Sequence, residues 1–410
     1  MRVLVYEHVS GGGYAGQPIL PSVLSEAFGM LRSVVSDFES SGNEVTVLLD
    51  ARLSKLNPPI AIDRIIPVFY PHEAKKILTE ASKINDAVYV IAPETGQTLQ
   101  SLVELVEHSE KASLNCDANA IANVADKAVL YETSKKNGLP TPNTARFNVD
   151  GDLEEVKQAI RNKFSYPAVF KPVDGVSCGG LSIVKEDSQV PKAISKIRSE
   201  SAGRHFVVQE FVEGESASVS LICTGRKASA VSLNWQNVKV AAPQASSSYE
   251  GGAVPFDHSL KEAAFKVAEK VVESFSGLRG YVGVDLVLAK GKPFVVDVNP
   301  RLTTSYVGLN RVAAFNIAEA MVNAVLNHKL PTKQETKGFA YFSKVETPQP
   351  AAGAFEKAAQ ISEVVSPPFP LDKYDEACSL VAGQGASWEN ARISFEEAKK
   401  QLFNIIGRGK

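Results

Sequence analysis

The chain has 410 residues, a formal net charge of −2 and 44% hydrophobic residues. This balance gives no basic surface for nucleic acid, and no apolar run reaches the roughly 18 residues that a membrane-spanning helix needs. Glu7 and His8 stand where a secretory signal requires an unbroken apolar segment, so we expect a cytoplasmic protein with reduced cysteines. The sequence leaves the oligomeric state open, a homodimer being one arrangement.

Strands and helices alternate through the first third of the chain. Strands are predicted at 2–7, 45–50, about 65–69 and 87–92, and helices at 21–41, 72–83 and 97–109. This alternation is typical of a parallel sheet with crossover helices, which places ligands at the carboxyl ends of its strands. Polar residues at those ends are therefore candidate substrate contacts, namely Glu7, His8, Ser10 and Glu94.

A glycine-rich loop after the first strand raises the alternative of dinucleotide binding. Gly11, Gly13 and Gly16 match the spacing G-x-G-x-x-G, in which a helix should open on the third glycine. Here Pro18 and Pro21 postpone the helix to about residue 21. We expect a glycine loop at the sheet edge, and an NAD(P)-binding oxidoreductase remains the alternative.

The rest of the chain has an α+β pattern. Helices are predicted at 117–137, 151–163, 190–200, 258–276 and 311–328, and strands at 167–171, 181–184, 205–210, 282–289 and 293–298. The residues beyond 330 predict a small α+β module with strands at 338–345 and 377–382 and a helix at 394–405.

Two clusters could bind phosphates and a nucleoside. Lys171 ends a strand and precedes a small-residue loop, 172–180, whose backbone N–H groups could cover phosphates while the lysine supplies charge. A plain hairpin is the alternative for this loop. The stretch VVQEFVEGE, residues 207–215, runs from a strand into an acidic hinge whose backbone could bind an adenine edge. Lys127 lies in the predicted helix 117–137 and by itself indicates no function.

A third cluster predicts a metal site. Asp285 and Asp297 lie in apolar strands joined by a tight turn, and Asp297 and Asn299 share one face of their strand. Buried carboxylates are costly unless they are paired or bound to a metal, and an all-oxygen set suits Mg²⁺. Arg301 could bind a phosphoryl or carboxylate group. Three polar residues satisfied by a backbone network are the alternative.

In this order, the clusters resemble the ATP-grasp superfamily of ligases. The resemblance implies a fold of the α/β and α+β classes, in which ATP lies between two subdomains behind a Rossmann-like pre-ATP-grasp domain. The implied domains are 1–114 (pre-ATP-grasp), 115–330 (ATP-grasp, with a lid at about 140–210 and a metal-binding core at about 211–330) and 331–410 (C-terminal module). Most such enzymes join a carboxylate to an amine through an acyl phosphate.

The resemblance also implies residue roles. ATP would be held by Lys127 and Lys171, by the loop residues Ser177, Cys178, Gly179 and Gly180, and by the hinge residues Gln209, Glu210, Phe211, Val212 and Glu215. Glu215 would bind the ribose, with Glu213 as the alternative. Mg²⁺, with Mn²⁺ as an alternative, would be held by Asp285, Asp297 and Asn299. Lys171 and Arg301 would be catalytic, and a carboxylate pocket would be formed by Thr303, Thr304 and Ser305.

A narrower resemblance rests on five stretches, VYEHVSGG, APETG, NCDANAIANVADK, GESASVSL and VVDVNPRLTTSYVGL. They are similar to the tyramine–L-glutamate ligases of methanofuran biosynthesis. The implied partners are a small-molecule amino acid and an amine, with neither nucleic acid nor membrane. Motifs that bind ATP do not indicate which amine is used, so a ligase for another amino acid and amine remains an alternative.

Overall fold

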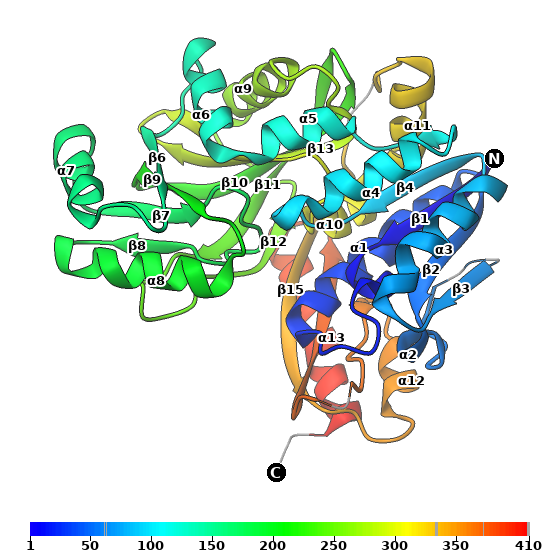
Figure 1. The fold of residues 1–410 in the computed structure, drawn as a ribbon. Coiled ribbons are helices and arrows are strands. Elements are labelled where there is room, and N and C mark those ends of the chain that lie inside the picture. The colour runs from blue at the N-terminus through cyan, green and yellow to red at the C-terminus, as the bar shows by residue number, and fades with distance from the viewer. Residues whose placement is uncertain (61, 63, 333–334, 372, 408–410) are drawn as a thin grey trace.

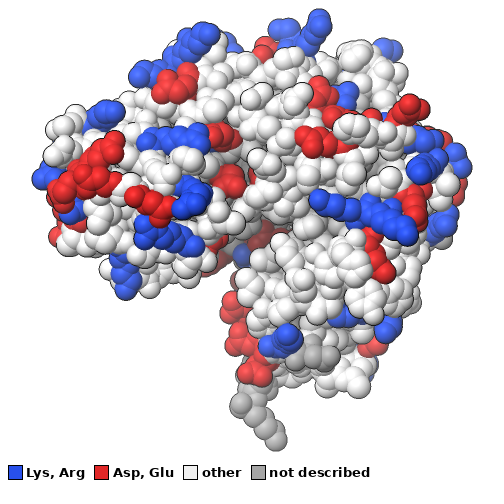
Figure 2. Space-filling view, in the orientation of Figure 1, with Lys and Arg blue, Asp and Glu red and all other residues white. Residues whose placement is uncertain are grey.

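The computed structural model describes residues 1–60, 62, 64–332, 335–371 and 373–407. The strands of this part of the chain form three sheets, of five, eight and four strands (Figure 1). No helix within the described residues is long and apolar enough to cross a membrane. Acidic and basic side chains intersperse over the face shown in Figure 2, as the small net charge predicts, and a deep notch separates the left lobe from the lower one.

The N-terminal sheet is parallel, with the order β3-β2-β1-β4-β5. Its strands are β1 (Arg2–Glu7), β2 (Glu44–Asp50), β3 (Arg64–Val68), β4 (Ala87–Ile91) and β5 (Ala112–Ser113). Its helices are α1 (Pro21–Ser40), α2 (Ala51–Ser54), α3 (Pro71–Ile84) and α4 (Thr98–Glu107). The connections run outward in both directions from β1 and β4, so the carboxyl ends of these two strands mark the switch point where such sheets bind ligands.

The glycine loop packs tightly against this sheet. A Cβ added to Gly12 would lie 2.5 Å from Cβ of Val68, and one added to Gly13 would lie 2.3 Å from the ring of His8. The helix α1 begins only at Pro21, well beyond the loop. The glycines therefore allow close packing, and they do not place a helix N-terminus against a pyrophosphate as the dinucleotide motif requires.

The four-stranded sheet forms the left lobe of Figure 1, with the antiparallel order β6-β9-β7-β8. Its elements are β6 (Thr144–Asn148), α7 (Leu153–Lys163), β7 (Ala168–Pro172), β8 (Ser182–Val184), η3 (Asp187–Gln189), α8 (Val190–Glu200) and β9 (His205–Glu210). Phe170 and Phe206 stack at 5.7 Å between ring centroids within a hydrophobic core that this lobe has to itself. The phosphate-loop candidate joins β7 to β8.

The eight-stranded sheet has the order β14-β13-β10-β11-β12-β15-β17-β16. Its strands are β10 (Glu215–Thr224), β11 (Ala228–Lys239), β12 (Ser248–Val254), β13 (Arg279–Ala289), β14 (Lys292–Asn299), β15 (Phe339–Pro348), β16 (Val364–Ser366) and β17 (Glu376–Gly385). The accompanying helices are α5 (Ala118–Ala125), α6 (Lys127–Lys136), α9 (Lys261–Glu273), α10 (Ser305–Val312), α11 (Ile317–Asn327), α12 (Ala354–Ala359) and α13 (Trp388–Ile406).

The C-terminal residues share this sheet with the metal-site hairpin. β15 pairs with β12 through Gly251 and Ser343, and β17 and β16 continue the sheet beyond β15. Trp388, the first residue of α13, packs edge-on against Trp235 of β11 at 5.7 Å. The segment 331–410 therefore completes the central sheet. The domain boundaries proposed from the sequence stay predictions.

Two helices predicted as continuous are each divided, the first near its middle and the second near its start, so both predictions are wrong there. The helix 117–137 breaks at Asp126, whose carboxylate caps α6 by accepting hydrogen bonds from the backbone N–H of Ala128 and Val129. The helix 311–328 breaks before Asn316, which caps α11 through the N–H of Glu319 at 2.8 Å. In both cases a short polar side chain accepts hydrogen bonds from the first N–H groups of a new helix, within a stretch whose apolar pattern reads as one helix.

Candidate active site

The break at Asp126 places Lys127 at the first turn of α6, facing the metal-site hairpin. The Nζ atom of Lys127 lies 2.9 Å from Oδ2 of Asp297 and donates to the carbonyl of Gly175 in the phosphate loop at 3.0 Å. Lys171 Nζ donates to the carbonyl of Val296 at 2.9 Å. Both lysines thus converge on β14, although one comes from a helix start and the other from the lid sheet.

Asp285 and Asp297 are register partners on β13 and β14. Asp285 accepts hydrogen bonds from Gln236 Nε2 at 2.9 Å and from Asn299 Nδ2 at 3.0 Å. Burial, reinforced by the neighbouring Asp297, raises the pKa of Asp285 to about 6. Burial likewise lowers the pKa of Lys171 to about 8, against the attraction of Asp297.

This donor set fits a divalent cation. Two neighbouring, partly buried carboxylates disfavour each other's charge, and a cation between them would relieve the repulsion that, after burial, raises the pKa of Asp285. The amide of Asn299 donates through nitrogen to Asp285, which leaves its oxygen for a metal. An all-oxygen set without His or Cys is the set that Mg²⁺ prefers.

The phosphate-loop candidate has a backbone suited to anions. Ser177 (φ 51°) and Cys178 (φ 64°) are consecutive residues in the left-handed region, which non-glycine side chains rarely adopt. The N–H groups of Ser177 and Cys178 bond to no other residue that the structure describes. The loop is anchored where Gly180 N–H donates to Glu200 Oε2 at 2.7 Å. Successive free N–H groups of this kind form an anion-binding concavity.

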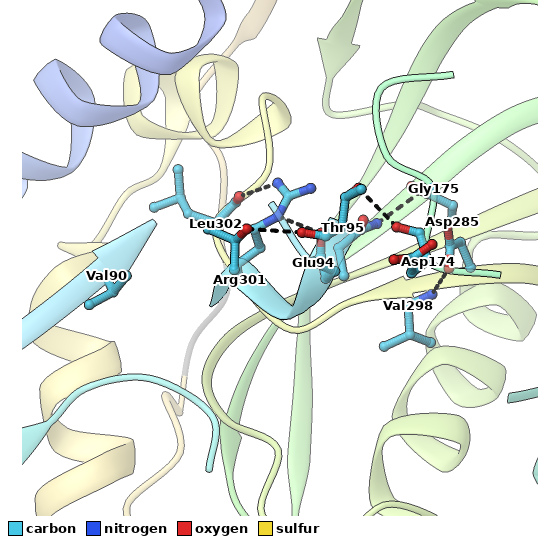
Figure 3. A network of polar contacts seen from close by, with 12 residues as sticks. Val90, Glu94, Thr95, Asp174, Gly175, Asp285, Val298, Arg301 and Leu302 are labelled. Atoms are coloured by element: carbon cyan, nitrogen blue, oxygen red, sulfur yellow. Dashed lines mark hydrogen bonds and ion pairs between the residues drawn. The ribbon is translucent and has the colours of Figure 1, made fainter. Parts of the chain in front are cut away.

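A second contact ties the same loop to the N-terminal sheet (Figure 3). Asp174 accepts from the backbone N–H of Gly96 through Oδ2 at 3.0 Å, and its carbonyl accepts from Thr95 Oγ1 at 3.0 Å. Thr95 and Gly96 belong to the short 3₁₀ turn η2 (Thr95–Gln97) that follows β4. The loop is thereby held between this turn and β14.

Arg301 connects the metal strand to the same turn. Its Nε donates to Oε2 of Glu94 at 3.1 Å, and its Nη1 donates to the carbonyl of Leu302 at 3.1 Å. Burial opposes the charge of Arg301, but Glu94 and the aspartates of the metal site outweigh it and raise the pKa of the guanidinium. Figure 3 shows Arg301 and Glu94 together beside Thr95.

The hinge between β9 and β10 offers free backbone groups. The N–H and C=O of Val212 bond to no other described residue, whereas Glu210 is held by Asn143 Nδ2 at 2.9 Å. Gly214 is required here because a Cβ would lie 2.4 Å from the carbonyl oxygen of Leu288. The hinge therefore presses against β13.

The two candidate ribose acids lie on either side of that glycine. Glu215 lies 3.7 Å from Nε2 of His258, and Glu213 is exposed and has no partner among the described residues. Both remain candidates for the ribose.

The remaining substrate candidates are mostly engaged with the protein. The Ser10 N–H and hydroxyl both donate to Glu7 Oε2 at 2.6 Å, and these two residues are at most 2% exposed, so they close the turn after β1. His8 lines a cavity of about 420 Å³ together with Lys75 and Gly96, at the switch point of the sheet.

The three polar residues after the metal strand also have partners. They are Thr303 with Tyr281, Thr304 with Glu26, and Ser305 with Ser218. They link the metal strand to the interior and to α1. Nothing in the sequence spacing distinguishes these packing contacts from substrate contacts.

Several residues beside the site were not singled out from the sequence. Gln236 holds Asp285, and Lys344 of β15 pairs at 2.8 Å with Glu26 of α1, which also accepts from Thr304. Lys344 lies in a strand of ordinary alternation, and only the three-dimensional pairing of β15 with β12 reveals its position.

Comparison with known proteins agrees with this geometry. The family model for the ATP-grasp domain matches residues 124–305, and that for the pre ATP-grasp 3 domain matches residues 43–121. The tyramine–L-glutamate ligase of Methanocaldococcus fervens is 33% identical over 254 residues, which cover 62% of this chain and 71% of that protein. The chain belongs to the ATP-grasp family.

Solved structures share the fold of this ATP-grasp ligase over nearly its full length. The L-amino acid ligase of Bacillus licheniformis has a TM-score of 0.66 at 15% identity and covers 97% of each chain. The biotin carboxylase of Campylobacter jejuni has a TM-score of 0.73 at 14% identity and covers 98% of this chain and 94% of that one. The protein is an ADP-forming ligase that uses ATP to make C–N bonds.

Proposed function

We propose that this ligase joins L-glutamate to an aromatic amine of the tyramine class, through an acyl phosphate. The Methanocaldococcus fervens relative, which is 33% identical, is a tyramine–L-glutamate ligase, and it supports this choice of substrates. The observation that carries the acyl-phosphate proposal is the convergence of Lys127, Lys171 and the Asp285–Asp297 pair on one strand end, with Arg301 directly beyond. A role in methanofuran biosynthesis stays a prediction.

The proposed roles follow from the contacts. Lys127 and Lys171 neutralise the triphosphate, and the N–H groups of Ser177 and Cys178 cover its terminal phosphate. The free backbone of Val212 in the hinge receives the adenine edge. Gln209, Phe211, Gly179 and Gly180 complete the surroundings that the sequence predicts for ATP. These assignments are proposals for each residue.

Asp285, Asp297 and Asn299 would hold Mg²⁺. When bound, this ion supplies positive charge against the β- and γ-phosphates, so that an anionic carboxylate can approach. The charges of Lys127 and Lys171, which both contact β14 at or beside Asp297, would add to that shielding. The protein then acts by positioning the reactants and by excluding water.

The reaction follows in two steps. A carboxylate oxygen of the acid attacks the γ-phosphorus of ATP, the bond to the leaving ADP oxygen breaks, and an acyl phosphate forms. The amine nitrogen then attacks the acyl carbon, and the C–O bond to phosphate breaks. The free Nη2 of Arg301, which bonds to no other described residue, would hold the phosphoryl oxygens in both steps.

The test is release of ADP from Mg-ATP with a panel of amino acids, each with and without a panel of amines, while product masses are measured. We expect ADP and the amide mass only when L-glutamate and tyramine are both present. ADP with a different pair would retain the ligase and replace the substrates. An absence of ADP with every pair would overturn the proposed activity.

A further inference from the structure

Glu94 carries a buried oxygen atom that has no partner. Its side chain is 5% exposed, and Oε2 is bound to Arg301, but Oε1 forms no hydrogen bond with any described group. A buried carboxylate oxygen without a donor is costly, so its retention calls for a ligand that supplies one. The side chain lies at the end of β4, beside the switch point, where open parallel sheets bind ligands.

The position of this oxygen relative to Arg301 indicates the kind of donor. Glu94 is hydrogen-bonded to Arg301, and the charges of Glu94 and of the metal-site aspartates all act on the guanidinium. A phosphoryl or carboxylate group bound to the free Nη2 of Arg301 would therefore lie close to Glu94. If Arg301 holds the reacting group as proposed above, a group that donates to Oε1 would lie close to the reacting carbonyl.

A cationic amine satisfies these conditions. An ammonium group brings N–H donors and a positive charge, both of which complement a carboxylate oxygen. Glu94 and Arg301, at 3.1 Å, would thus hold the two reactants of the ligation side by side.

We propose that Oε1 of Glu94 binds the ammonium group of the amine substrate and takes its first proton. This assignment rests on the ligase function proposed above. The freed nitrogen lone pair attacks the carbonyl carbon of the acyl phosphate, and the C–O bond to phosphate breaks. The second proton passes from the amide nitrogen to the departing phosphate, so charge and atoms balance. Glu94 is then a catalytic residue for the second step and not for the first.

The test separates the two steps in Glu94→Gln. Glutamine keeps the shape and can still accept from Arg301, but it removes the charge that binds the ammonium. Hydroxylamine is a neutral nucleophile at neutral pH and traps the acyl phosphate as a hydroxamate without needing proton removal by Glu94. We measure amide formation as a function of amine concentration, and hydroxamate formation, for the wild type, Glu94→Gln and Glu94→Asp.

We expect kcat/KM for the amine to fall about tenfold or more in Glu94→Gln, which is the effect of losing a hydrogen bond to a charged group. Hydroxamate formation and the KM for ATP stay near the wild-type values, and Glu94→Asp recovers part of the loss. The matched control is Asp86→Asn, which alters an exposed carboxylate paired with Arg2 and should change neither product.

Two results would overturn the proposal. Equal losses of amide and hydroxamate in Glu94→Gln would mean that Glu94 only orients Arg301. Unchanged amide formation would mean that the oxygen has no role in amine binding. Failure of the proposed function itself is distinguishable, because the wild type would then form neither amide nor hydroxamate.

Discussion

Asp174, in the phosphate loop, accepts a hydrogen bond from the backbone N–H of Gly96, in the turn after β4, at 3.0 Å. The two residues come from different lobes, and Thr95 Oγ1 strengthens the connection by donating to the Asp174 carbonyl. Through these two contacts, the closure that we propose for the loop over ATP would be linked to the strand end that carries Glu94. Exclusion of water by this loop would then be coupled to the strand end where we propose that the substrate binds.

Thr95→Val removes one of these ties and should loosen the loop. We expect more acyl phosphate to be lost to water, because a neutral hydrogen bond of about 1 kcal/mol no longer favours closure. The ratio of ADP released to amide formed should rise several-fold. Thr79→Val is the matched control, since Thr79 Oγ1 bonds only within the exposed helix α3. A ratio equal to that of the control would contradict a role for the contact in closure.

Asp297→Asn should abolish turnover while leaving the fold intact. The carboxylate is the candidate metal ligand and the partner of Lys127 at 2.9 Å, so its loss removes charge that the triphosphate site depends on. We expect kcat to fall by about a hundredfold or more. Steady-state ADP release across a Mg²⁺ titration measures this, and near-ultraviolet circular dichroism checks the fold. Unchanged activity would remove the metal assignment.

The residues proposed to bind ATP could be singled out because the chemistry of the nucleotide limits their type and their place on strands. Lys171 at a strand end, Asp285 and Asp297 in apolar strands, and Arg301 after them are recognisable from local sequence, and the structure brings them together. Contacts between distant segments have no such signal. Glu94 and Arg301 are 207 positions apart, and their pairing depends on how the sheets pack.

The predictions that failed did so at short polar residues. The sequence around Asp126 reads as one helix because its apolar periodicity continues on both sides, but the capping of α6 outweighs it.

The glycines after β1 resemble a nucleotide motif because both need glycine for close backbone approach. Spacing alone does not tell whether a side chain such as Val68 or a phosphate is the close neighbour.

Gly12→Ala tests the packing explanation for that loop. Gly12 (φ 99°) and Gly16 (φ 73°) both lie in the left-handed region, but a Cβ at Gly12 would lie 2.5 Å from Val68 while one at Gly16 would meet nothing within 4 Å. Gly16→Ala should cost only the backbone strain, and Gly12→Ala about 2 kcal/mol more in free energy of unfolding. Urea denaturation measures both. Equal losses would contradict the packing explanation.

Asp37 should make stability depend on pH. It is buried on α1, where Tyr306 OH and Asn310 Nδ2 donate to it, and burial raises its pKa from 3.8 to about 6. The native state then binds more protons than the unfolded state between about pH 4 and 6, so the contribution of Asp37 to stability falls as pH rises through this window. Asp37→Asn has no such ionisation.

The free energy of unfolding of Asp37→Asn minus that of the wild type should therefore increase from pH 4 to pH 7, by at most roughly 3 kcal/mol. Urea denaturation at a series of pH values gives this difference. Glu39→Gln, which removes an exposed carboxylate from the same helix, is the matched control for the substitution. A difference for Asp37→Asn that does not change with pH, or that changes no more than the control, would contradict the raised pKa.

The acyl phosphate itself can be tested by following one oxygen atom. If the acid is labelled with heavy oxygen in both carboxylate positions, attack on the γ-phosphorus carries one labelled oxygen into the phosphate that is later released. Mass spectrometry of the phosphate, with the acid and amine pair that supports ADP release, should find one heavy oxygen per phosphate. Phosphate free of label, together with formation of the amide, would contradict the acyl-phosphate route.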